Sequence, residues 1–267
     1  MISPFPIVAA DVGNTRLKIG VFRQAPCDDF PEPDAWHGSP ISWTSSELDA
    51  FLPKDLAKHT CVVASVNRPA AARLVEHFER LGAQSVRVLS AADLPLMIRV
   101  DRPDLVGMDR LVGAIAVNRL RDPRRAAIVI DLGTAITVDL VAVDGGFEGG
   151  AILPGIGISA RALHAFTDLL PLVPMVELSE PPKALGKDTD QAVRSGLYWG
   201  SIGGVQQVAS KLGTGQADPQ LFLTGGAAPL VAGLLKDARG EAAQYIPHLT
   251  LGGIALAVCS SAGRGHG

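Results

Sequence analysis

The stretch AAIVIDLGTAIT, residues 126–137, decides the fold, because it joins a buried apolar run to an acid, a glycine turn and more apolar chain. A near-copy, IVAADVGNTRLK, occupies residues 7–18. Both follow the template apolar-apolar-x-x-Asp-x-Gly-x-Thr, with the threonine matching to within one position. In each copy the acid would face a metal-bound phosphate, and the glycine would let a backbone N–H approach a phosphate oxygen. The pair therefore predicts an enzyme that grips a nucleotide between two halves.

Length and composition favour a globular protein. The 267 residues suffice for one large domain or two smaller ones, and 47% hydrophobic against 19% charged residues favours a sizeable core over disorder. A net charge of −3 provides no electrostatic footprint for nucleic acid or an anionic membrane. The three cysteines form no CxxC pair, which favours a reducing cytoplasm over a zinc site or disulfide framework. We expect neither a signal peptide nor a membrane span.

The N-terminal copy reads as a β-hairpin. Residues 5–12 and 16–23 are β-prone and meet at Gly13-Asn14, two residue types that tolerate the positive φ of hairpin turns. Residues 24–46 contain four prolines, which predicts an irregular surface segment or short edge strands.

A strand–helix–strand pattern follows the hairpin. Residues 61–66 and 86–89 are short apolar strands, and residues 69–81 form a helix between them that Gly82 closes. This spacing predicts a βαβ unit with parallel strands.

The rest of the chain alternates helices and turns with two further strands, the first at residues 138–143. Helical patterns occupy residues 111–121, 158–170, 188–212, 227–238 and 249–262. A strand at residues 220–224 runs into Gly225-Gly226, a third glycine-rich strand-to-helix junction. The many small residues within 188–212 predict close packing against another backbone, for example that of a second subunit. The GxGxxA match at residues 155–160 is discounted because Pro154 occupies the turn.

The loop PLMIRVDRPDLVGMDR, residues 95–110, has two interpretations. Pro103 and Gly107 break any regular element, so Asp109 and Arg110 stand at a loop-to-helix junction. In the functional interpretation Asp109 is a base and Arg110 clamps an anion. In the structural one Asp109 is an N-cap followed by an exposed arginine. Spacing alone favours the N-cap.

Seven motifs, in order, resemble the type III pantothenate kinase family of the acetate and sugar kinase, Hsp70 and actin superfamily. They are DVGNT (11–15), VGMDR (106–110), DLGTAIT (131–137), GGAILPG (149–155), GKDTDQAVRSG (186–196), TGGAA (224–228) and LTLGG (249–253). The resemblance implies an α/β fold of two ribonuclease-H-like, actin-like ATPase domains, with mixed sheets flanked by helices and a cleft between them. Residues 1–120 would form the N-terminal domain, and residues 121–267 the C-terminal domain that carries the dimer interface through GGAILPG.

The resemblance also implies an activity. It is the ATP-dependent phosphorylation of pantothenate to 4'-phosphopantothenate, the first step of coenzyme A biosynthesis, by a cytoplasmic homodimer without nucleic-acid or membrane partners. Asp109 resembles the catalytic base, Gly107 and Arg110 resemble substrate-binding residues, and Thr189 resembles the threonine that closes the partner subunit's pantothenate pocket. Val100 stands where family members often have a substrate-binding tyrosine.

The nucleotide and metal sites are implied in the same way. The implied ATP-binding residues are Asp11, Val12, Gly13, Asn14, Thr15, Arg16, Leu17 and Lys18 in the first loop, Gly133 and Thr134 in the second, and Gly225 and Gly226 near the adenosine. Asp131 resembles the ligand of an activating monovalent cation, K⁺ or NH₄⁺, and Asp11 would meet Mg²⁺ through a phosphate.

Two other functions stay open at this point. One is another small-molecule kinase or a polyphosphate phosphatase of the superfamily, against which the VGMDR loop argues. The other is a non-catalytic family member with an accessory or regulatory role. The intact acids Asp11, Asp109 and Asp131 argue against that loss of catalysis.

Overall fold

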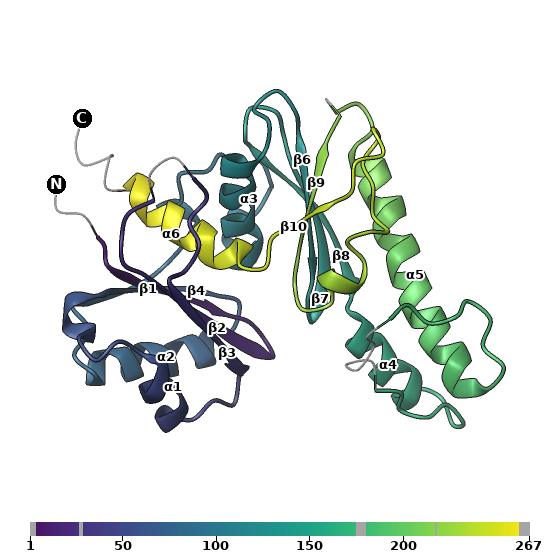
Figure 1. Cartoon of the computed structure of the whole chain (residues 1–267), viewed down its shortest axis with the longest axis horizontal. Coiled ribbons are helices and arrows are strands. Elements are labelled where there is room, and N and C mark those ends of the chain that lie inside the picture. Colours follow the sequence, from purple (N-terminus) through teal and green to yellow (C-terminus); the bar gives the residue numbers. More distant parts are fainter. Residues whose placement is uncertain (1–3, 27–28, 175–179, 217, 262–267) are drawn as a thin grey trace. The chain divides into compact units, whose positions relative to one another are not determined.

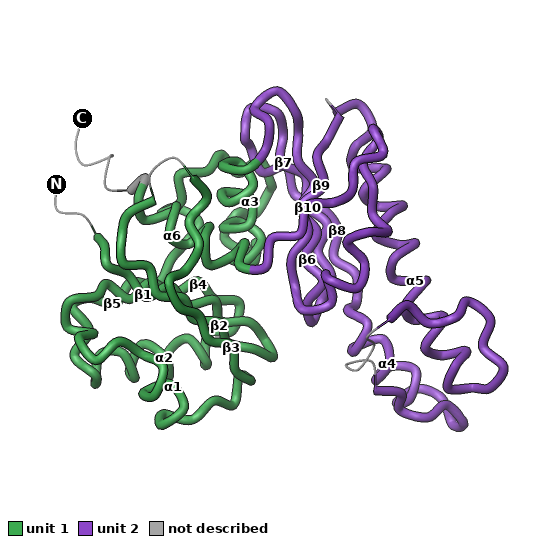
Figure 2. Tube along the Cα trace, viewed as in Figure 1, with its two compact units in different colours: residues 1–120, 248–267 green, residues 121–247 purple. Residues whose placement is uncertain are grey.

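The chain divides into two compact units (Figure 2). The computed structural model describes residues 4–26, 29–174, 180–216 and 218–261. Unit 1 comprises Met1–Leu120 and His248–Gly267, and unit 2 comprises Arg121–Pro247. The break after Leu120 coincides with the predicted domain boundary, whereas the C-terminal segment, predicted to lie in the second domain, groups with unit 1.

Unit 1 is built on a five-stranded mixed sheet in the order β3-β2-β1-β4-β5. Its strands are β1 (Ile7–Val12), β2 (Arg16–Phe22), β3 (Ala35–Pro40), β4 (Thr60–Ser65) and β5 (Ser85–Val88). Its helices are α1 (Ser45–Phe51), α2 (Arg68–Arg80), α3 (Met108–Leu120) and α6 (Leu249–Ser261), with 3-10 turns at Leu56–Lys58, Ala91–Asp93 and Pro103–Leu105. β1 pairs antiparallel with β2 and parallel with β4, and β4 pairs parallel with β5, which confirms the hairpin and the βαβ unit.

Helices cover both faces of this sheet. Figure 1 shows α1 and α2 on one face and α3 and α6 on the other. Side chains alternate along β1, so Val8, Ala10 and Val12 join the core beneath α1 and α2. By the same alternation Asp11 faces the side that carries α6, which contacts β1.

Unit 2 repeats the same sheet. Its strands are β6 (Ala127–Leu132), β7 (Ala135–Val141), β8 (Phe147–Pro154), β9 (Gln220–Thr224) and β10 (Gln244–Tyr245), in the order β10-β9-β6-β7-β8. Its helices are α4 (Ile156–Ala165) and α5 (Thr189–Leu212), with a 3-10 turn at Ala228–Leu230. β6 pairs antiparallel with β7 and parallel with β9, as β1 does with β2 and β4. The paired motifs in the sequence therefore occupy equivalent strands of two sheets with the same topology.

The long helix α5 covers one face of the second sheet. Tyr198, which is fully buried, packs in the core with Ile202 and Val205, and its hydroxyl donates to the carbonyl of Leu230 at 2.9 Å. Of the helices that the structure describes, none combines the length and apolarity needed to cross a membrane.

The predicted helix at 227–238 was wrong. The structure has a 3-10 turn at Ala228–Leu230, further turns, and an isolated bridge between Lys236 and Ala242. Pro229 would be tolerated in the first turn of that helix, but Gly233 lies in its middle, where glycine is an unfavourable helix residue.

The first hairpin turn requires glycine at position 13 for a different reason from the positive φ that was predicted. Gly13 does not have a positive φ; its N–H donates to the carbonyl of Arg16 at 2.9 Å, and an added Cβ would lie 3.1 Å from that oxygen. The prediction for Gly82 is confirmed, because this residue follows α2 with a φ of 74°.

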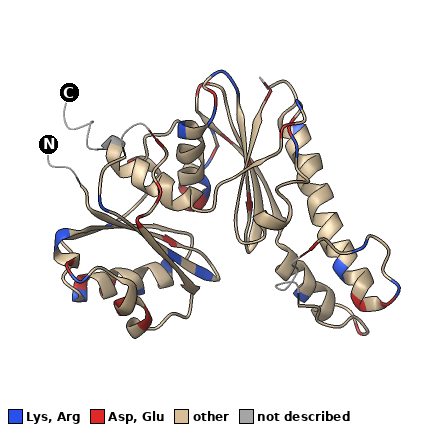
Figure 3. Cartoon of the chain, viewed as in Figure 1, with Lys and Arg blue, Asp and Glu red and all other residues tan. Residues whose placement is uncertain are grey.

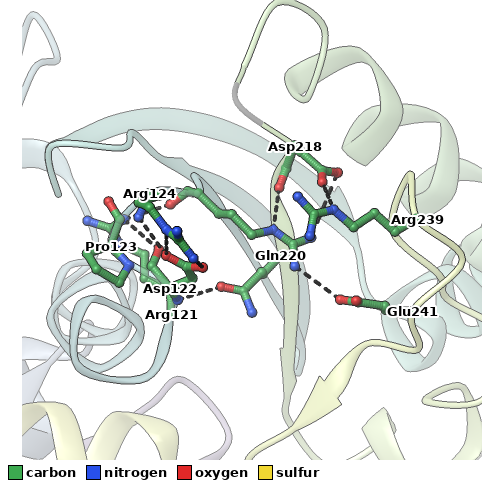
Figure 4. A network of polar contacts seen from close by, with 9 residues as sticks. Arg121, Asp122, Pro123, Arg124, Asp218, Gln220, Arg239 and Glu241 are labelled. Carbon is green, nitrogen blue, oxygen red and sulfur yellow. Dashed lines mark hydrogen bonds and ion pairs between the residues drawn. The ribbon is translucent and has the colours of Figure 1, made fainter.

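A buried arginine joins three segments at one end of unit 2. Arg125 is only 7% exposed. Its Nη2 donates to Asp237 Oδ2 at 2.6 Å, its Nη1 to Glu241 Oε2 at 3.1 Å, and its Nε to the Asp218 carbonyl at 2.8 Å. Figure 4 shows the part of this network that reaches Asp218 and Glu241. The guanidinium thus ties the start of β6 to the chain before β9 and to the loop before β10.

The Arg125 network predicts a large stability loss on substitution. Arg125→Met removes a buried cation and leaves the Asp237 carboxylate, whose side chain is 3% exposed, without its partner. We expect the free energy of unfolding to fall by ~3 kcal/mol in urea denaturation. Arg124→Met is the matched control: Arg124 is exposed and pairs only with the neighbouring Asp122, so a change within ~0.5 kcal/mol is expected. Equal losses in the two variants would contradict the assignment.

The same network has a pH signature. Burial tends to raise the pKa of Asp237, but hydrogen bonds from Arg125 and from the backbone N–H groups of Glu241 and Arg239 hold it below its usual range. A carboxylate with a lowered folded pKa stabilises the protein above its unfolded pKa, and this contribution is lost as the pH falls through the folded value. Wild-type protein should therefore lose more stability between neutral and acidic pH than Arg125→Met.

Candidate active site

Asp11, the penultimate residue of β1, is half-buried. It stands opposite Lys18 in the β1–β2 ladder, and its Oδ2 accepts a hydrogen bond of 3.0 Å from the hydroxyl of Thr250 in α6. Burial raises the pKa of Asp11, and the charge of Lys18 and the Thr250 hydrogen bond offset part of that rise. The carboxylate is therefore held in place in a partly desolvated position.

The rest of the first loop divides into exposed and buried residues. Asn14, Thr15 and Arg16 are exposed in the turn beyond Asp11, where a ligand can reach them. Val12 and Leu17 are each 1% exposed, so their side chains belong to the core and only their backbone could contact a nucleotide. Sequence reasoning thus grouped together residues whose side chains have different roles.

Asp131 occupies the equivalent place in the second loop. It is the penultimate residue of β6, is half-buried, and stands opposite Thr137 in the β6–β7 ladder. Gly133 is exposed and donates its N–H to the carbonyl of Ala135 at 3.1 Å, as Gly13 does in the first loop, while Thr134 is half-buried. The two loops therefore match in strand position, and in both the glycine N–H bonds to the first residue of the next strand, although the first turn is one residue longer.

The third glycine junction lies directly against the second loop. Gly225 has a φ of 98°, and a Cβ added there would overlap the Asp131 carboxylate and the backbone of Leu132. The N–H of Ala227 donates to the Leu132 carbonyl at 3.3 Å. Gly226 is exposed, and its added Cβ would meet no atom within 4 Å. Unit 2 therefore brings Gly225 and Asp131 together, which the sequence placed 94 positions apart.

Asp131 carries the donor chemistry that a hard cation requires. Its carboxylate packs directly on the Gly225 backbone, since a Cβ added at position 225 would overlap it. Carboxylate oxygen is a donor that such cations accept, and Thr224, 2% exposed, stands opposite Asp131 in the β6–β9 ladder.

Asp109 stands in the first turn of α3. The helix begins at Met108, so Asp109 lies inside it and the N-cap interpretation was wrong in position. Its half-buried carboxylate accepts the N–H of Arg110 at 2.9 Å through Oδ1. A Cβ at Gly107 would lie 2.5 Å from that oxygen, so glycine leaves the room that the carboxylate occupies. Arg110, the next residue, is also half-buried.

A pocket adjoins this loop within unit 1. It has a volume of about 1010 Å³ and lies between α2 and the segment that leads to α3. Val106 and Met108, which flank Gly107, contribute to its wall, together with apolar side chains and the polar Ser65, Arg68 and Ser90. Val100, predicted to bind substrate, is half-buried but does not line this pocket.

Thr189 belongs to a different unit from Asp109. It is the exposed first residue of α5, directly after the N-cap Asp188, whose side chain accepts the N–H of Gln191 at 2.8 Å. Thr189 lines an open pocket of about 770 Å³ with Gly186 and Leu163.

Unit 1 brings Asp11, Lys18 and Thr250 together, and unit 2 brings Asp131 and Gly225 together. Thr250 was missed as a site residue; the LTLGG motif was its only signal in the sequence.

Comparison with known proteins identifies one family. The family model described as type III pantothenate kinase matches residues 7–211. A type III pantothenate kinase of Desulfosudis oleivorans is 33% identical over 260 residues, covering 94% of this chain and 97% of the relative. Those of Phenylobacterium zucineum and Maricaulis maris are 36% and 40% identical, covering 82% and 72% of this chain and 80% and 73% of the relatives.

Solved structures share the fold. The ethanolamine utilization protein EutJ of Carboxydothermus hydrogenoformans superimposes with a TM-score of 0.51 at 15% identity, covering 96% of this chain and 92% of that one. A putative 2-dehydro-3-deoxygalactonokinase of Sinorhizobium meliloti has the same TM-score and identity, covering 96% and 98%. At this identity the likeness concerns the fold alone, and it supports the two-domain α/β architecture predicted from the paired motifs.

The Gly225–Asp131 contact predicts different costs at two adjacent glycines. Gly225→Ala forces a side chain into a left-handed backbone and into the Asp131 carboxylate, so a loss of at least ~2 kcal/mol in the free energy of unfolding is expected. Gly226→Ala meets open space at an ordinary φ and should change stability by under ~1 kcal/mol. Urea denaturation measures both. A Gly225→Ala variant as stable as Gly226→Ala would show that the junction yields without strain.

Proposed function

Because this chain belongs to the type III pantothenate kinase family, we propose that its Asp11, Asp109 and Asp131 loops transfer the γ-phosphoryl group of ATP to pantothenate. The reaction yields 4'-phosphopantothenate, the first intermediate of coenzyme A biosynthesis. The observation that carries the proposal is the pair of equivalent strand–Asp–Gly loops, with a third carboxylate in the first turn of α3.

Asp109 acts as the general base. The primary hydroxyl of pantothenate attacks the γ-phosphorus, an O–P bond forms, the bond to the β-phosphate oxygen breaks, and ADP leaves. The hydroxyl proton passes to the Asp109 carboxylate, whose orientation is held by the Arg110 N–H and by the space at Gly107. A positioned base of this kind typically contributes ~10²–10⁴-fold to the rate. Arg110 supplies a guanidinium for the pantothenate carboxylate or for charge that develops at the phosphate.

The paired loops bind the nucleotide. The exposed turn at Asn14, Thr15 and Arg16 and the exposed Gly133 offer backbone and side-chain donors to phosphate oxygens. Asp11 and Lys18 hold opposite charges beside this turn. Mg²⁺, when bound with the nucleotide, neutralises phosphate charge as phosphoryl transfer requires. Asp131, seated on the Gly225 backbone, supplies the carboxylate for a monovalent cation such as K⁺ or NH₄⁺.

The surfaces of α5 and β8 support the proposal of a homodimer. Added Cβ atoms at Gly196, Gly200 and Gly203 would meet no atom of this chain within 4 Å, so the small face of α5 is open. No charged residue lies between Arg194 and Lys211, and this stretch of α5 is tan in Figure 3. In the GGAILPG motif of β8, Ile152 is 63% exposed. These features support an interface in which Thr189 completes the partner's pocket. We place the enzyme in the cytoplasm, where the thiols of Cys61 and Cys259 stay reduced.

An assay of pantothenate phosphorylation with ATP tests the base. Asp109→Asn keeps the shape of the side chain but cannot accept a proton, so the turnover number should fall by roughly 10²-fold or more while the protein stays folded. Asp101→Asn, on the same loop, is the control: Asp101 is exposed and does not line the pocket beside this loop, so turnover should stay within about two-fold.

Two results of that assay would count against the proposal. Unchanged turnover in Asp109→Asn would reduce Asp109 to a structural residue of the helix start. Equal wild-type rates in potassium, ammonium and sodium salts would remove the monovalent cation from Asp131.

Mixing two inactive variants tests the shared pocket. Asp109→Asn and Thr189→Glu each disable both sites of their own homodimer, whereas a heterodimer has one site with both defects and one with neither. With free subunit exchange, about a quarter of wild-type activity should return. Persistent inactivity despite demonstrated exchange, or a fully active monomer at assay concentration, would show that each chain builds its own site.

A further inference from the structure

We propose that the hydroxyl of Thr250 is a positioning group that fixes the Asp11 carboxylate for its work on the nucleotide. This inference rests on the proposed function, because it assigns a role to a residue that acts through Asp11. It gives the LTLGG segment at residues 249–253, which no step above uses, a specific part in the site.

The contact itself joins the two ends of the chain. Thr250 is 3% exposed, and its Oγ1 lies 3.0 Å from Asp11 Oδ2, a donor–acceptor distance in the normal range for a hydroxyl and a carboxylate. The two residues are separated by 239 positions, yet both lie in unit 1. The hydrogen bond to Oδ2 restricts rotation of the carboxylate and therefore decides how its other oxygen, Oδ1, is presented.

Helix α6 holds Thr250 rigidly. A Cβ at Gly253, one turn from Thr250, would overlap the carbonyl of Val112 in α3, and a Cβ at Gly252 would overlap the ring of Phe30. α6 therefore lies with its backbone against α3, the helix whose first turn carries Asp109. A residue placed by two such close contacts has little freedom to move, which is what a positioning group requires.

The positive charge of Lys18 gives this contact a further purpose. Lys18 stands opposite Asp11 in the β1–β2 ladder and attracts the same carboxylate. Without the Thr250 hydroxyl, the carboxylate would be free to turn toward Lys18. A valine at position 250 would fill the same volume as threonine and lack only the hydroxyl, so the substitution isolates the hydrogen bond.

The test compares Thr250→Val with Thr250→Ser. Calorimetric titration with ADP and Mg²⁺, without pantothenate, should show roughly ten-fold weaker binding for Thr250→Val, since a hydrogen bond to a charged group is lost. In the kinase assay KM for ATP should rise by a similar factor while KM for pantothenate stays within about two-fold. Thr250→Ser retains the hydroxyl and should restore both values to near wild type. Thr250→Ala replaces the valine variant if thermal unfolding shows that valine destabilises the fold.

The outcomes separate this inference from the proposed function. Wild-type protein that binds ADP with Mg²⁺ but does not phosphorylate pantothenate, with weaker binding in Thr250→Val, supports the positioning role and overturns the substrate. An active wild type with Thr250→Val unchanged in both assays overturns the positioning role alone. Equal losses in the valine and serine variants also overturn it, because they would trace the effect to packing and not to the hydroxyl.

Discussion

A half-buried carboxylate at the end of a strand is the constraint on which this structure depends. Asp11 and Asp131 each stand one residue before the end of the first strand of a sheet, and burial opposes the negative charge of Asp11. Such a group needs fixed partners on the protein side if it is to face a ligand in one orientation. The chain supplies them in two ways: Thr250 and Lys18 flank Asp11, and the Gly225 backbone underlies Asp131.

Glycine provides the close approaches in both units. At Gly225 the backbone adopts a left-handed conformation and also touches a carboxylate, so two requirements meet at one residue. Gly107 makes room for the Asp109 carboxylate, and Gly253 lets α6 lie on α3. These residues leave no apolar pattern in the sequence. Their function becomes visible only when the atoms that would meet a side chain are known.

The two units have separate sheets of the same topology but differ in the helices around them. In unit 1, α2 connects β4 to β5 and α3 follows β5. In unit 2 the matching connection between β9 and β10 contains only a 3-10 turn, and α6, which follows β10, packs in unit 1. Because α6 packs in unit 1, the C-terminal helix supplies a partner to Asp11 there. It also means that a boundary drawn from the repeat alone assigned α6 to the other unit.

The sequence by itself determined the first hairpin, the βαβ unit, the strand at 220–224 and the three acids, because alternation, turn residues and repeated motifs are local properties. It also indicated the family, since seven motifs stand in one order. Local reasoning failed at 227–238, where the predicted helix is replaced by a 3-10 turn and further turns. Only the tertiary structure decided that Thr250 meets Asp11, that Gly225 supports Asp131 and that α6 joins unit 1. Each of these depends on contacts between segments about 100 to 240 residues apart, and no pattern within a single segment encodes a distance across the fold.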